Sequence, residues 1–73
     1  MYHAEEIKVG SVVEAKRTGK TYVVTGFHPD KIYGTIIELQ DEEDLGQLEY
    51  ATYRDIKLGY SILSIEPEES EEE

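Results

Sequence analysis

Three of the seven basic residues in this 73-residue chain lie within five positions, in the segment KRTGK at residues 16–20. Lys16, Arg17 and Lys20 are residue types that bind phosphate oxygens, so the segment could contact nucleic acid. The same segment contains Gly19, which can adopt the positive φ angle that a tight β-hairpin turn requires. We interpret it first as an exposed hairpin turn and keep phosphate binding, with the nearby Lys31 added, as the alternative.

The segment DEED brings together four carboxylates, those of Asp41, Glu42, Glu43 and Asp44. Clustered carboxylates can bind calcium, but a calcium loop has acids at alternate positions, then Gly and a later Glu, and this run lacks that pattern. Acid–base catalysis needs burial to separate the pKa values of two carboxyl groups, whereas a loop of four acids should be solvated. We therefore interpret DEED as a contact surface for a basic partner.

The two histidines, His3 and His28, do not indicate a metal site, because the chain has no Cys and the spacing is not that of known ligand motifs. The sequence also contains no Ser–His–Asp arrangement, no P-loop and no glycine-rich dinucleotide motif. We expect no catalytic residues, no metal and no cofactor, and predict that the protein is not an enzyme.

Six tyrosines are the remaining candidates for a binding surface, in a chain with one Phe and no Trp. Tyrosine rings are frequent in protein–protein interfaces and bind cations over their faces. We expect most of the six in the core or at its rim, with the hydroxyl reaching solvent. Tyr53 is the best exposed candidate, because a strand continuing through it would place it opposite Leu48 and Tyr50.

The net charge of −10 is concentrated in two places, since residues 41–44 contain four acids and residues 66–73 contain six. The rest of the chain has seven acids and seven bases and is neutral. A run of like charges at a chain end repels itself and stays solvated. The sequence thus predicts one folded domain over residues 1–65 and a disordered acidic tail over residues 66–73, which is either a solubility aid or an arm for a basic partner.

The N-terminal segment MYHAEEIKVG has neither the apolar run nor the basic region of a signal peptide. No stretch approaches the roughly 20 apolar residues that a membrane-spanning helix needs. We expect a cytoplasmic protein without contact with a membrane.

Alternation of apolar and polar residues predicts five short strands, at residues 9–15, 21–27, 32–39, 47–53 and 61–65. Gly34 inside the third strand suggests a bulge or sharp bend, and residues 28–31 suggest the preceding turn. Thr52 could cap a single helical or 3₁₀ turn over residues 53–58, which Gly59 would end. The predicted core consists of Val9, Val13, Val23, Phe27, Ile37, Leu39, Leu48, Tyr50, Ile56, Leu58, Leu63 and Ile65.

These elements resemble those of SH3-like barrels of the KOW or Tudor type over residues 7–65. The resemblance rests on the start IKVGSVVEAKRTGKTYVVTGF, the bent third strand and the single turn before a short fifth strand. It implies an all-β, five-stranded antiparallel barrel with one short helical turn before the last strand. Closure into a barrel would leave no strand edge exposed.

Two functions from different classes follow. The first is a non-enzymatic protein-interaction module, such as a small phage or bacterial regulator, that uses DEED, the tail and Tyr53 against a basic surface. Its strongest form is a nucleic-acid mimic that occupies the groove of a nucleic-acid-binding protein. The second is direct binding of RNA or DNA through Lys16, Arg17, Lys20 and Lys31. We favour the first, because a strongly negative chain is repelled by a polyanion.

Overall fold

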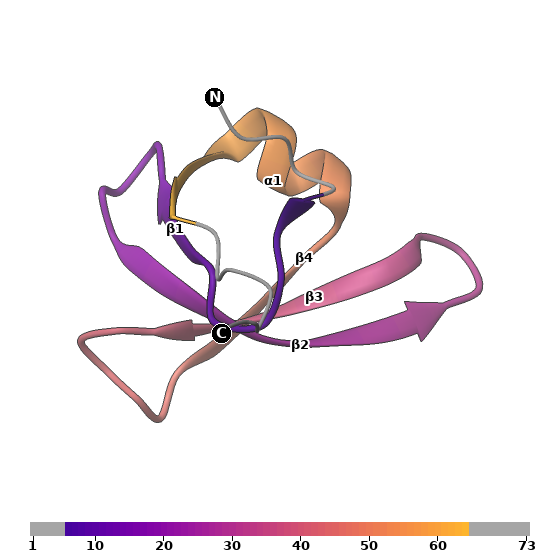
Figure 1. Ribbon diagram of the computed structural model, residues 1–73, viewed down its shortest axis with the longest axis horizontal. Helices are drawn as coiled ribbons and strands as arrows, with labels where there is room; N and C mark the ends of the chain where they lie inside the picture. The colour runs from indigo at the N-terminus through magenta and orange to yellow at the C-terminus, as the bar shows by residue number, and fades with distance from the viewer. Residues whose placement is uncertain (1–5, 65–73) are drawn as a thin grey trace, which may run out of the picture.

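The computed structural model describes residues 6–64, and within that range the chain forms five strands and one short helix (Figure 1). In chain order these are β1 (Val12–Ala15), β2 (Thr21–Asp30), β3 (Gly34–Asp41), β4 (Leu48–Ala51), the helix α1 (Tyr53–Gly59) and β5 (Tyr60–Ser64). All strand pairs are antiparallel. The predicted all-β class, with one helical turn before the last strand, is confirmed. The predicted acidic tail lies outside the described residues.

The five strands form one sheet with the order β4-β3-β2-β1-β5. In the described part of the chain β4 and β5 are the two edges and do not pair with each other, so the sheet is open. The predicted closure into a barrel is therefore not confirmed. Helix α1 connects the two edge strands and packs against β3, β4 and β5.

Strands β2 and β3 form a long hairpin that extends well past β1 and β4 (Figure 1). The ladder contains an irregularity between Val24 and Gly26, so the bulge lies in β2 and not at Gly34 as predicted. Pro29, predicted to be in a turn, pairs with Thr35 inside the hairpin. β1 does not extend alongside that part of β2. Because proline has no N–H, it is tolerated where no neighbouring strand would accept a hydrogen bond from that position.

The turn at the tip of this hairpin covers residues 31–33. One carboxylate oxygen of Asp30, Oδ2, accepts hydrogen bonds from the N–H groups of Ile32 and Tyr33, both at 2.9 Å. Gly34 then has a φ of 84°, a left-handed conformation that a residue with a side chain would resist. Asp30 and Gly34 together fix the reversal of the chain.

The core is built mainly from fully buried side chains of β1, β2, β3 and α1. These residues are Val13, Val24, Ile37, Leu39 and Ile56, and Ile7, Tyr22 and Ala51 complete the cluster. Four of them were predicted, namely Val13, Ile37, Leu39 and Ile56. Five other predicted core residues are exposed by between 43% and 63%, namely Leu48, Leu63, Val9, Tyr50 and Leu58. Phe27 is half-buried against the core, and Ile65 lies outside the described residues.

For β2 and β4, the sequence predicted the wrong side of each strand to be buried. Val13 pairs with Tyr22, so Tyr22 and Val24 face inward and Val23 faces the other side. In β4 it is the small Ala51 that pairs with the fully buried Ile37 and is itself buried. Because side chains alternate strictly along a strand, a shift by one residue exchanges the whole inner and outer sets.

Within residues 6–64, the seven-residue α1 is far too short to cross a membrane, and no helix meets the requirement for a spanning segment.

The two adjacent valines of β2 provide a matched test of this assignment. Val24→Ala should lower the free energy of unfolding by about 1–2 kcal/mol more than Val23→Ala, because only Val24 leaves a cavity in the core. Both substitutions remove the same two methyl groups and the same preference for a strand, so their difference isolates burial. Urea denaturation followed by circular dichroism measures it, and equal losses would contradict the observed face of β2.

Candidate functional site

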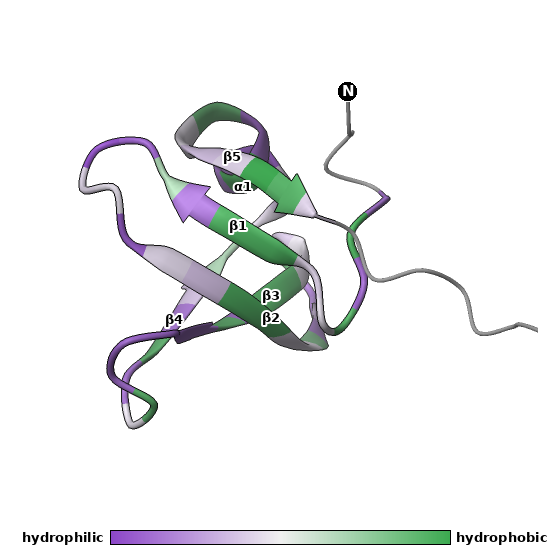
Figure 2. Cartoon of the chain, turned by 60° about the vertical axis from the view of Figure 1, so that its left-hand side comes forward, coloured by the Kyte–Doolittle hydropathy of each residue, from purple (hydrophilic) through white to green (hydrophobic). Residues whose placement is uncertain are grey.

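The two charged segments singled out in the sequence lie at the same end of the sheet, opposite the tip of the β2–β3 hairpin (Figures 1 and 2). The β1–β2 turn contains Lys16, Arg17 and Lys20, and the β3–β4 connection follows Asp41 directly. The N–H of Glu42 donates to the carbonyl oxygen of Thr21 at 3.0 Å, which ties the connection to the start of β2. Nζ of Lys20 lies 3.9 Å from Oδ2 of Asp41.

Asp41 differs from its three acidic neighbours because its side chain is buried, with an exposed fraction of 6% for the residue. Its Oδ1 accepts hydrogen bonds from the N–H groups of Glu43, at 2.8 Å, and Asp44, at 3.3 Å. A buried carboxylate needs such donors because its lone pairs have lost water. Asp41 was predicted to contact a partner; in the structure it is buried and holds the loop that follows.

We call residues 42–47 the acidic loop. Glu42, Glu43 and Asp44 are all exposed, as predicted, and Leu45 beside them is 67% exposed. The side-chain amide of Gln40 donates to the carbonyl oxygen of Leu45 at 2.7 Å. The loop is therefore an ordered protrusion that presents three carboxylates and one apolar side chain to solvent.

Tyr53 is half-buried, and its ring stacks on that of Phe27 with centroids 6.4 Å apart. The prediction that it is exposed was wrong, because the chain leaves the strand conformation after Ala51 and α1 begins at Tyr53. Thr52 caps this helix as predicted. Its hydroxyl accepts the N–H of Asp55 at 3.1 Å, and its own N–H donates to the Asp55 carboxylate at 3.0 Å.

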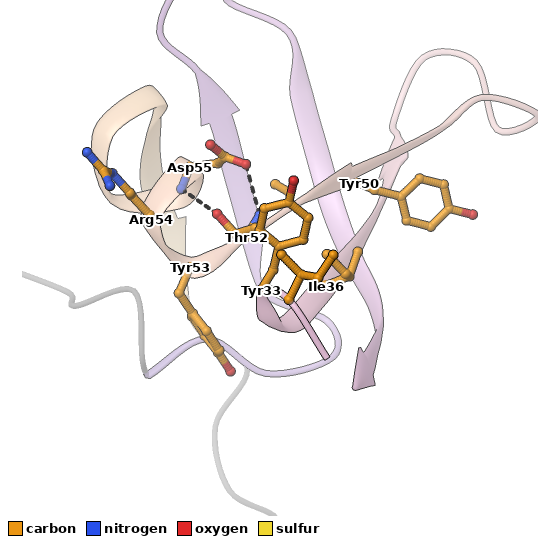
Figure 3. Close-up of a pocket in the computed structure, with 9 residues that line it drawn as sticks. Tyr33, Ile36, Tyr50, Thr52, Tyr53, Arg54 and Asp55 are labelled. Atoms are coloured by element: carbon orange, nitrogen blue, oxygen red, sulfur yellow. Dashed lines mark hydrogen bonds between the residues drawn. The ribbon is translucent and has the colours of Figure 1, made fainter. Parts of the chain in front are cut away.

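Tyr33 and Tyr50 were not predicted to be exposed, and they are the strongly exposed tyrosines among the described residues, at 65% and 58%. Together with Tyr53 they surround an open hollow of about 680 Å³, which we call the aromatic hollow. In Figure 3, Tyr33 and Ile36 lie between Tyr53 and Tyr50, while Arg54 points away from the rings. The grouping follows from the pairing of Tyr50 with Glu38, two residues from Ile36, which no local sequence pattern indicates.

A second hollow, of about 570 Å³, also borders Tyr50 and continues toward the β1–β2 turn. Its apolar lining includes Tyr22, Tyr60 and Leu58, and its charged lining consists of Lys16, Arg17, Glu49 and Asp55, so we call it the mixed-charge hollow. The rings of Tyr22 and Tyr60 meet edge to face, with centroids 6.1 Å apart. Burial raises the pKa of the Tyr60 phenol, and Tyr22, Glu49 and Asp55 raise it further because they disfavour the phenolate.

The basic residues proposed for nucleic-acid binding do not form one surface. Lys16, Arg17 and Lys20 share the exposed β1–β2 turn, but Lys31 lies in the turn at the other end of the ten-residue β2. Lys20 also lies beside the carboxylate of Asp41. The structure thus leaves a smaller basic cluster than the sequence suggested.

His28 and Glu38 form a polar pair across the β2–β3 hairpin. Nε2 of His28 lies 2.8 Å from Oε1 of Glu38, and the hydroxyl of Thr25 donates to Oε2 at 2.9 Å. The hydrogen bond with His28, then that from Thr25, lowers the pKa of Glu38 below its ordinary value of 4.5. Across the described residues, no three His, Asp or Glu side chains are placed to hold a metal ion. His3 lies outside the described range.

Comparison of the chain with protein-family models, with curated proteins and with solved structures finds no match. The resemblance to SH3-like barrels, drawn from the sequence, therefore has no support from these comparisons.

Removal of the buried carboxylate should loosen the acidic loop. Asp41→Ala leaves the N–H groups of Glu43 and Asp44 without their acceptor, which should cost about 1–3 kcal/mol of unfolding free energy. Hydrogen exchange at those two amides should become faster. Asp41→Asn keeps a carbonyl acceptor and is the matched control, so slow exchange at both amides in the Ala variant would contradict the role assigned to Asp41.

The Glu38 pair should make stability depend on pH. A carboxyl group whose pKa is lowered by folding stabilises the folded state above its unfolded pKa, and this contribution disappears as the pH falls through the lower, folded pKa. Wild type should therefore be more stable than Glu38→Gln at pH 6, and the difference should shrink below about pH 4.5. Thermal melts of both proteins across that range measure it, and a difference that is constant with pH would contradict the assignment.

Proposed function

We propose that this protein is a non-enzymatic interaction module that binds a basic surface of a partner protein. The observation that carries the proposal is the acidic loop, in which Glu42, Glu43 and Asp44 are exposed while the buried Asp41 holds their backbone. A loop that is ordered before binding loses less conformational entropy when the partner arrives. Three adjacent carboxylates also attract a basic partner over a distance and so increase the rate of encounter.

The surroundings of the loop supply apolar contacts as well as charge. Leu45 is exposed within the loop, and β4 continues from it to the exposed Leu48 and Tyr50. Aromatic rings surrounded by polar groups are typical of residues that dominate binding energy in protein interfaces. We therefore extend the proposed contact surface from the acidic loop along β4 and replace Tyr53 by Tyr50 as its principal tyrosine.

A basic partner surface of this kind is common on proteins that handle nucleic acids, and we propose that class of partner. We also propose that the protein acts in the cytoplasm, where reducing conditions match a sequence without Cys. Direct binding of RNA or DNA is the less favoured function, because Lys31 is separated from the β1–β2 turn and Lys20 lies near Asp41. The experiment below distinguishes the two.

Neutralising the charges of the acidic loop should abolish binding of the partner. The triple variant Glu42→Gln, Glu43→Gln, Asp44→Asn should lose a basic protein that the tagged wild type retains from a nuclease-treated bacterial lysate. Retention by wild type should fall at high salt, because salt screens exposed charges within about 10 Å at 0.1 M. The readout is mass spectrometry of the retained proteins.

The matched control is Glu71→Gln, Glu72→Gln, Glu73→Gln, which changes the net charge by the same amount at another place in the sequence. If both triple variants lose the partner equally, either net charge alone determines binding or the tail is an arm for the same partner, and in both cases the loop is not the specific site. If retention depends on nucleic acid and disappears with nuclease, the β1–β2 turn is the contact and the proposed function is wrong.

A further inference from the structure

We propose that the partner binds by adding an extended, basic segment to the open edge of β4, with an apolar side chain of that segment in the aromatic hollow. This inference rests on the proposed function and specifies how the partner is held. It joins three features that lie side by side along β4: an unpaired strand edge, the acidic loop at one end and the aromatic hollow at the other.

The first feature is the backbone of β4. Among residues 6–64 this strand pairs only with β3, so its other side has no strand neighbour. The N–H of Asp41 donates to the carbonyl oxygen of Gln47 at 3.1 Å, which shows that Gln47 directs its backbone toward β3. Because hydrogen-bonding direction alternates along an antiparallel strand, Glu49 also faces β3, and Leu48 and Tyr50 direct their N–H and C=O groups to the open side.

The edge of β4 carries neither Lys, Pro nor a bulge, although the strand is short and Glu49 is a charge on its inner face. Protected edges carry Lys or Pro, contain a bulge, or are covered by another element. The sequence of β4 is LEYA, with Glu49 as its single charged residue, and its register with β3 is regular. Leu48, Glu49 and Tyr50 are all exposed. The strand can therefore accept a partner strand, whose main-chain hydrogen bonds would contribute affinity without depending on sequence.

The second feature is side-chain recognition on the outer face of the sheet. Leu48 and Tyr50 share this face with their pairing partners Gln40 and Glu38, whereas Glu49 and the buried Ala51 are on the other. The aromatic hollow adjoins the end of β4, between Tyr50 and Tyr33. Alternate side chains of an added strand would thus lie over Leu48 and Tyr50, and one at its end would enter the hollow.

The third feature is charge, which determines what kind of segment fits. Glu42, Glu43 and Asp44 immediately precede β4, and Glu49 lies within it. Lys16 and Arg17 line the mixed-charge hollow and not the aromatic hollow, and three of the four acids lie at the loop end of the strand. Basic residues of the partner should therefore cluster at that end and an apolar anchor at the other.

The other edge, β5, does not combine these features. Its sequence YSILS contains no charged residue, and of its residues only Tyr60 lines one of the two hollows described above. The geometry thus points to β4 as the docking edge.

The test uses the full chain as bait for a phage-displayed library of random linear peptides, with elution by high salt. Selected peptides are synthesised, and their affinity is measured for wild type, Leu48→Pro and Leu48→Ala. Both variants lose the leucine side chain, but only proline removes the N–H that points to the open side. Proline is tolerated at the first residue of an edge strand, so the fold should survive.

We expect Leu48→Pro to bind the peptides about tenfold more weakly than Leu48→Ala, through the lost hydrogen bond and the clash of the ring with an added strand. In wild type, the peptide should slow hydrogen exchange at the amides of Leu48 and Tyr50. This hydrogen-exchange measurement needs no variant, so it tests strand addition even if Leu48→Pro does not fold.

Equal affinity for the two Leu48 variants, with unchanged exchange at both amides, would overturn strand addition. The loop variant Glu42→Gln, Glu43→Gln, Asp44→Asn separates that result from failure of the proposed function. If it loses the peptides while the proline variant keeps them, the acidic loop binds a basic partner by charge alone. If no peptide is selected, strand addition falls and the lysate experiment decides the proposed function; if every variant keeps the peptides, both proposals fall.

Discussion

The pairing of β2 with β3 is the constraint on which the rest of the structure depends. This hairpin contributes Tyr22, Val24, Ile37 and Leu39 to the core; β1, β4 and α1 pack on it, and β5 is joined to it through β1. The register of β4 on β3 then places Ala51 opposite the buried Ile37, which directs Leu48 and Tyr50 outward. The exposed side chains of the proposed binding edge are thus a consequence of burial on the opposite face.

The charges of the molecule are arranged around the same hairpin. Its closed end carries the Asp30 turn, and its open end receives the basic β1–β2 turn and the acidic loop. Lys20 lies close to the buried Asp41, while the three exposed acids beyond Asp41 face solvent. One carboxylate of the DEED segment thus supports the other three, so identical residue types in a row have different roles.

The sequence was sufficient for the strand content, the Gly19 hairpin turn and the Thr52 cap, because each depends on neighbouring residues alone. It was insufficient for the faces of β2 and β4. TYVV fits either register, since both valines suit a strand, and the choice depends on β1 and β3, which are distant in the chain. Tyr53 was misplaced for a related reason, because the cap at Thr52 ends the strand alternation that its predicted exposure assumed. The aromatic hollow joins Tyr33 to Tyr50 across the sheet, and local patterns contain no such information.

An open strand edge normally invites association with a second copy of the same chain. Here each copy carries a net charge of −10, and acids lie at and beside the edge that is open. Two such edges repel each other at ordinary ionic strength, whereas a basic strand is attracted to either. In the proposed interaction, the carboxylates that attract a basic partner strand therefore also disfavour pairing of this edge with a second copy of the chain.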